Sequence, residues 1–156
     1  MDLILPQDDD IDGWEVFLLN LPDEFMSRPQ KLNLMLMLHT RHNLFEPLPV
    51  IRDLLEHHDL WLGAVMDRGV LEPRGSKYIV PKIITNLNKL RSVGSHYWNV
   101  DTLFILTMAE HVAAVTQLAE HWNSSVITVL SGEVSDELTG FGRGIHPSQI
   151  IGVWWD

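Results

Sequence analysis

The last third of the chain has the clearest pattern of hydrophobic and polar positions. TLFILT at 102–107 is a short apolar run that predicts a buried strand, and apolar side chains recur at helical spacing over 108–122. The β-branched run at 125–130 predicts a second strand, and a third, at 149–155, follows a segment rich in glycine and polar residues. The pattern therefore predicts a β-α-β-loop-β unit over 102–155, with a mixed sheet backed by the helix.

Local signals predict where the 108–122 helix begins and ends. Thr107 followed three residues later by Glu110 has the pattern of a capping box, in which each side chain accepts a hydrogen bond from an unpaired backbone amide. Asn123 tolerates a left-handed backbone and is a typical residue at a helix end. We therefore expect the helix to begin near residue 108 and to end at Asn123.

The middle of the chain is mainly helical in pattern, with two stretches that fit more than one element. PLPVIRDLLEHH predicts a helix opened by proline, whereas 59–69 fits a second helix or a buried strand. Residues 32–40 likewise fit a helix, favoured by leucine and methionine, or a strand. A tight turn at PRGS and a helix from Pro81 complete a helix-helix-hairpin-helix unit over 47–91. This order of elements resembles that of a winged-helix unit.

The chain as a whole is predicted to be one compact α+β domain over 1–156. It has no internal repeat and no long low-complexity linker, and 156 residues are enough to bury a substantial core. Charge is unevenly distributed: 11 basic and 21 acidic residues give a net charge of −10, which opposes general nucleic-acid binding because phosphates would be repelled. Residues 1–13 form an acidic N-terminal segment, whereas 74–91 contain five basic residues and no acid.

Composition excludes several kinds of chemistry. The chain has no cysteine, which rules out disulfides, thiolate nucleophiles and cysteine-ligated zinc. Its first ten residues lack the basic start and apolar stretch of a secretory signal, and its apolar runs are much shorter than a membrane span. We therefore expect a cytoplasmic protein that does not bind a membrane.

The acidic stretch DDDIDGW at 8–14 raises the question of a calcium site. Its aspartates and glycine match positions 1, 3, 5 and 6 of an EF-hand loop, but Leu19 stands at position 12, where a bidentate glutamate belongs. The segments EHHD and AEH place carboxylates beside histidines, and HTRH contains two histidines, but none of these segments has the spacing of a zinc motif. No phosphate-binding or nucleophile motif occurs either. The sequence therefore predicts no metal, no cofactor and no catalytic residue, and it favours a non-enzymatic role.

The first functional hypothesis is an acidic protein that binds and neutralises a basic protein, as bacterial immunity proteins and antitoxins do. The six tryptophans agree with it, because tryptophan is common at binding hot spots. Trp154 and Trp155 face opposite sides of a strand, so Trp155 either reaches a partner or covers the second sheet face under a helix. The residues expected to contact the partner are Asp8, Asp9, Asp10, Asp12, Glu133, Asp136, Glu137, Trp155 and Asp156.

Two alternatives come from other classes of protein. A winged-helix regulator would bind nucleic acid through a basic stripe, and this hypothesis fails if 59–69 is a strand. A small hydrolase or transferase would need one histidine–carboxylate pair to converge in space with a second. The basic stripe consists of Arg74, Lys77, Lys82, Lys89 and Arg91.

Overall fold

The computed structural model describes residues 3–42, 44–67, 97–98, 100–130, 133–140 and 147–156. These residues form an α+β fold with a four-stranded sheet, which confirms the predicted fold class. The elements of the first half are α1 (Ile11–Asn20), α2 (Arg28–Leu38), α3 (Pro47–Glu56), the 3-10 turn η1 (His58–Leu60) and β1 (Gly63–Asp67). Those of the second half are β2 (Thr102–Met108), the 3-10 turn η3 (Ala109–His111), α5 (Val112–Glu120), β3 (Val126–Leu130), α6 (Glu133–Thr139) and β4 (Ser148–Trp154).

The sheet has the strand order β1-β2-β4-β3, and every pair of neighbouring strands is antiparallel. β4 lies between β2 and β3, so the two strands joined by α5 run parallel to each other without pairing directly. The predicted strand-helix-strand succession is present, but the mixed sheet is a wrong expectation for the described strands. The reason is the last strand, which inserts between its two predecessors and supplies antiparallel partners to both.

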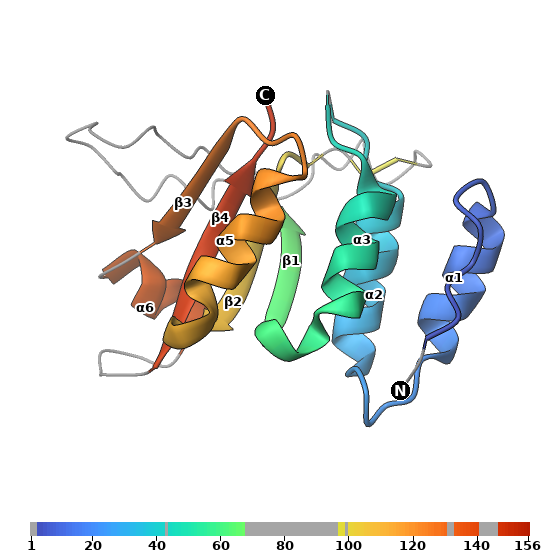
Figure 1. Ribbon diagram of the computed structural model, residues 1–156, viewed down its shortest axis with the longest axis horizontal. Helices are drawn as coiled ribbons and strands as arrows, with labels where there is room; N and C mark the ends of the chain where they lie inside the picture. Colours follow the sequence, from blue (N-terminus) through green and yellow to red (C-terminus); the bar gives the residue numbers. More distant parts are fainter. Residues whose placement is uncertain (1–2, 43, 68–96, 99, 131–132, 141–146) are drawn as a thin grey trace.

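The helices are arranged along and beside the sheet (Figure 1). α5 crosses one face of the sheet, and α3 lies next to it in front of α2. α2 packs alongside the edge strand β1, and α1 packs against the far side of α2. α6 lies at the opposite end of the molecule from α1. The core is therefore enclosed between the helices and one sheet face, and α1 and α2 extend the molecule beyond the sheet edge.

Gln30 of α2 protects the outer edge of β1. Its side-chain amide donates a hydrogen bond to the carbonyl of Ala64 at 2.7 Å, and its amide oxygen accepts one from the backbone N–H of the same residue at 2.9 Å. A strand edge otherwise presents unpaired backbone groups to other chains. The glutamine thus takes the place of one residue of a neighbouring strand and attaches α2 to the sheet.

Trp155, directly after β4, is a core residue and is fully buried. Its ring meets that of Phe45 edge-on, with centroids 4.7 Å apart, and its Nε1 donates a hydrogen bond to the carbonyl of Trp122 at 3.0 Å. The prediction that Trp155 contacts a partner at the surface is therefore wrong. Trp154 points to the opposite sheet face and is half-buried there beside Leu130 and Ile150. The residues that decide this orientation come from distant parts of the chain.

The predicted start of the late helix is also corrected. β2 continues through Thr107, whose hydroxyl donates to the carbonyl of Leu60 at 2.5 Å, so this threonine is not a helix cap. The helix proper, α5, begins only after the 3-10 turn η3. Asn123 has φ 53°, which confirms the predicted left-handed residue after the helix.

Both ambiguous stretches are resolved. Residues 32–40 lie mostly within helix α2. Ser27 caps the start of this helix, and Pro29 is accommodated in its first turn, where no intrahelical N–H donor is needed. The stretch 59–69 contains strand β1. A winged-helix unit needs its second helix there, so the winged-helix interpretation of 47–91 is wrong. The basic stripe at 74–91 lies outside the described residues.

Candidate functional site

The four N-terminal aspartates gather at the beginning of α1, and all of them are exposed. Asp10 caps the helix, since its carboxylate accepts a hydrogen bond from the N–H of Gly13 at 2.8 Å. A side chain at residue 13 would collide with that carboxylate, because an added Cβ would lie 2.1 Å from Asp10 Oδ2. Asp8 forms an ion pair with Arg52 of α3. The acidic run therefore forms the capped start of α1 and is connected to α3 by the ion pair of Asp8 with Arg52.

The EF-hand spacing of this run does not make a metal site in the structure. Asp10 is engaged by the backbone of its own helix, and Asp12 lies in the first helical turn. Among the described residues, no group of three or more histidines and carboxylates is placed to hold a metal ion. At this helix start Asp10 serves as the cap and Asp8 pairs with Arg52, whereas Asp9 and Asp12 are exposed to solvent.

A cleft of about 840 Å³ opens beside the acidic run. It lies where α1 begins, α2 ends and α3 begins, so the loop between α2 and α3 forms much of its wall. Phe45 anchors that loop in the core, and its N–H donates to the carbonyl of His42 at 2.8 Å. The lining combines acidic, basic, imidazole and apolar groups. The polar members are Asp8, His39, Thr40, Arg41, His42, Glu46 and Tyr97.

Backbone pairing places Tyr97 in this cleft. The N–H of Trp98 donates to the carbonyl of His39 at 3.0 Å, and the N–H of Arg41 donates to the carbonyl of Trp98 at 3.2 Å. The Arg41 guanidinium then lies over the Tyr97 ring, 4.0 Å from its centroid, in a cation–π contact. The cleft therefore has one wall in which a cation is already held against an aromatic ring.

Glu15 and His39 link the two helices at the same end of the molecule. Glu15 Oε1 of α1 lies 2.5 Å from His39 Nε2, which follows directly after α2. Both side chains remain about one-third exposed, at 35% and 37%. His42 lines the same cleft as His39. This is the carboxylate–imidazole contact that a catalytic pair would need.

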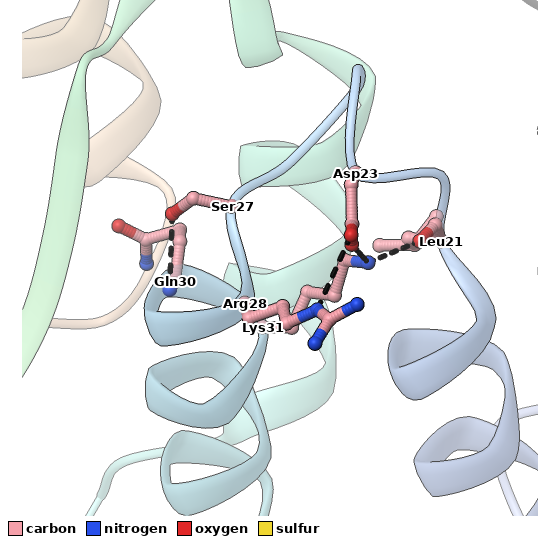
Figure 2. A network of polar contacts seen from close by, with 6 residues as sticks. All are labelled: Leu21, Asp23, Ser27, Arg28, Gln30 and Lys31. Carbon is pink, nitrogen blue, oxygen red and sulfur yellow. Dashed lines mark hydrogen bonds and ion pairs between the residues drawn. The ribbon is translucent and has the colours of Figure 1, made fainter.

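Lys31 forms the other link between α1 and α2, at their opposite ends (Figure 2). Its side chain is buried, with 5% exposed, and its ammonium donates to the carbonyl of Leu21 and to Asp23 Oδ1, the latter at 2.6 Å. Arg28 reaches the second carboxylate oxygen of Asp23 at 3.2 Å. The pKa of the Asp23 carboxyl is lowered, first by the hydrogen bond from Lys31 and then by the positive charges of Lys31 and Arg28, although partial desolvation opposes the shift.

The lowered pKa of Asp23 predicts acid-sensitive stability. A carboxyl whose pKa is lower in the folded than in the unfolded state stabilises the fold above its usual pKa of 3.8, and this stabilisation is lost as pH falls through the folded value. Asp23→Asn should therefore be less stable than the wild type at pH 6, and the two should converge below about pH 3.8. Urea unfolding at a series of pH values measures this, and a difference that is independent of pH would contradict it.

The helical half carries most of the negative charge. Residues 3–67 contain 12 acidic and 4 basic residues, a net charge of −8. Three of the basic residues, Arg28, Lys31 and Arg52, form ion pairs with aspartates, and the fourth is Arg41 on the cleft wall. The basic side chains of this half are therefore mostly engaged in ion pairs within the chain, whereas Asp9 and Asp12 are exposed.

The structure brings only part of the predicted partner-binding set together. The N-terminal aspartates form one cluster, whereas Glu133, Asp136 and Glu137 lie on α6 at the opposite end of the molecule. Asp156 is exposed at the C-terminus, and Trp155 beside it is buried. The aspartates at the start of α1 and the helix α6 therefore do not lie on one compact surface.

The residues that join the acidic run to the rest of the site could not be identified from local sequence patterns. Glu15 and His39 are 24 residues apart, and nothing in the local pattern of either indicates the contact. The motif HTRH drew attention to His39, but its partner carboxylate comes from another helix. The positions of Arg41 and Tyr97 likewise depend on backbone pairing between distant segments.

Comparison of the chain with protein-family models, curated proteins and solved structures gives no match. A separate finding concerns membranes: among the described helices, none is both long and apolar enough to span a bilayer.

Proposed function

We propose that this chain is a non-enzymatic module that binds and neutralises a basic protein, in the manner of an immunity protein or antitoxin. The observation that supports it is the exposed acidic run at the edge of the cleft, in a half of the chain with a net charge of −8. A concentrated negative potential steers a positively charged partner and raises its association rate. The cleft beside the run offers aromatic and apolar contacts to a side chain of that partner. We expect this binding to take place in the cytoplasm.

Replacing Asp9 and Asp12 by asparagine is expected to slow association with the basic partner about tenfold at low salt, because these carboxylates contribute to steering. Both are exposed, and no hydrogen bond or ion pair of their side chains is found within the described residues. The double variant Asp9→Asn/Asp12→Asn keeps the cap at Asp10 and the ion pair of Asp8. Association rates at several salt concentrations measure the effect.

The matched control is Glu56→Gln/Asp59→Asn, which removes two exposed acidic groups from the other end of α3. The partner is first captured from a nuclease-treated lysate of the source cell and identified by mass spectrometry, and its activity is then assayed with and without this chain. A basic protein that the wild type and the control bind and inhibit, and that the Asp9/Asp12 variant binds more slowly, supports the proposal. Equal rates for both variants, or capture that disappears with nuclease, would overturn it.

A further inference from the structure

α1 and α2 form an antiparallel pair whose relative orientation is fixed at both ends (Figure 1). Lys31, in the first turn of α2, contacts Leu21 and Asp23 just after α1. At the other end, His39 after α2 contacts Glu15 in the first half of α1. Two contacts at opposite ends of the pair determine which side chains of the two helices lie next to each other.

The Glu15–His39 contact identifies one shared surface of the two helices. Residues three, four or seven apart lie on the same side of a helix. Leu19 is four residues after Glu15, and Leu36 and Leu32 are three and seven residues before His39. Asp12 is three residues before Glu15. These six side chains form a surface that we call the outer face: Asp12, Glu15, Leu19, Leu32, Leu36 and His39.

The centre of the outer face is apolar and exposed. Leu19 is 52% exposed, Leu32 54% and Leu36 39%, although each belongs to a helix whose opposite side packs in the core. Single exposed leucines are common on protein surfaces, but three at these positions of two packed helices point to an apolar patch of the kind that binds a partner. The patch is acidic at the end where Asp12 and Glu15 lie.

We propose that the outer face binds an amphipathic helix of the basic partner. Apolar side chains of that helix would pack on Leu19, Leu32 and Leu36, and its lysines or arginines would lie toward Asp12 and the acidic run. This inference rests on the proposed function and specifies the segment of the partner that is recognised. A second copy of this chain is the poorer occupant, because two molecules that each carry a net charge of −10 repel each other.

The probe is a fluorescently labelled synthetic peptide of leucine and lysine, patterned as an amphipathic helix of about 18 residues, or five turns. Leu19→Gln/Leu36→Gln is expected to raise its Kd at least about tenfold, because both leucines lie in the apolar centre of the face. Leu62→Gln is the matched control, since Leu62 is 58% exposed and precedes β1 rather than belonging to α1 or α2. A peptide of the same charge with serine in place of leucine should bind weakly to all three proteins.

The same variants applied to the natural partner separate the two proposals. The proposed function fails if the wild type captures no basic protein. The outer-face inference alone fails if a captured basic protein binds the Leu19→Gln/Leu36→Gln variant as tightly as it binds the wild type. It fails equally if the synthetic peptide binds both proteins with the same Kd. It also fails if sedimentation shows a wild-type dimer that the leucine variant loses, because the occupant is then a second copy of the chain. Loss of both peptide and partner by the leucine variant, with Leu62→Gln unaffected, supports it.

Discussion

Trp155→Ala is expected to lower the free energy of unfolding by about 3–5 kcal/mol, the largest effect of any substitution considered, as for other large aromatic residues truncated in a core. The indole is fully buried, meets the ring of Phe45 edge-on and donates a hydrogen bond to the carbonyl of Trp122. The variant loses the apolar burial, the ring contact and the donor together. Because a domain is stable by only about 5–15 kcal/mol, such a loss removes a large part of its total stability.

Two matched variants test the reason for this effect. Trp155→Phe keeps an aromatic ring but removes the donor, so it should cost clearly less than alanine. Trp154→Ala removes the neighbouring indole from the opposite, half-buried sheet face and should also cost less. Urea unfolding followed by far-UV circular dichroism measures all three. A loss below about 1 kcal/mol for Trp155→Ala would contradict the core position.

Lys31→Ala is expected to destabilise the protein by about 2–4 kcal/mol, the second-largest effect. The ammonium is buried and donates to the carbonyl of Leu21 and to Asp23, so truncation leaves a buried acceptor without its donor. Truncation also removes the aliphatic part of the side chain from the junction of α1 and α2. The cost lies at the low end for a buried ion pair because about half of the Asp23 side chain, 54%, is exposed.

Lys31→Met separates the two contributions, since methionine keeps much of the side-chain volume but has no ammonium. Its expected cost is about 1–3 kcal/mol, the penalty of an unsatisfied buried acceptor. Arg28→Met is the control, because Arg28 contacts the same carboxylate with 83% of its side chain exposed and should change stability by less than about 1 kcal/mol. If Lys31→Met were as stable as the wild type, the buried ammonium would have no stabilising role.

Several elements were predictable because their signals are local. The amphipathic spacing in PLPVIRDLLEHH predicted α3, and its four apolar positions are the buried ones: Val50, Ile51, Leu54 and Leu55. The apolar run TLFILT predicted β2, and Asn123 marked the turn after the late helix. The acidic character and exposure of the N-terminal segment also followed from composition, since neighbouring carboxylates are rarely buried without partners.

The candidate site was predictable only in part, because its members meet through distant contacts. The sequence placed four aspartates together, but the cleft beside them requires the ends of three helices and Tyr97 to converge. The outer face depends on the register of α1 against α2, which is fixed by Glu15 with His39 and by Lys31 with Asp23. None of these pairings follows from the pattern of either helix alone.

The helix and strand periods, the charge imbalance and the acidic run could be derived from the sequence, because each depends on residues close together in the chain. Three features required contacts between distant segments: β4 inserts between β2 and β3, Thr107 donates to the carbonyl of Leu60 instead of capping a helix, and Trp155 faces the core. The two-residue period of a strand places neighbouring side chains on opposite faces of the sheet, but it does not determine which of the two faces is covered by the rest of the chain. That choice is made by helices and loops from elsewhere in the chain, here through Phe45 and Trp122.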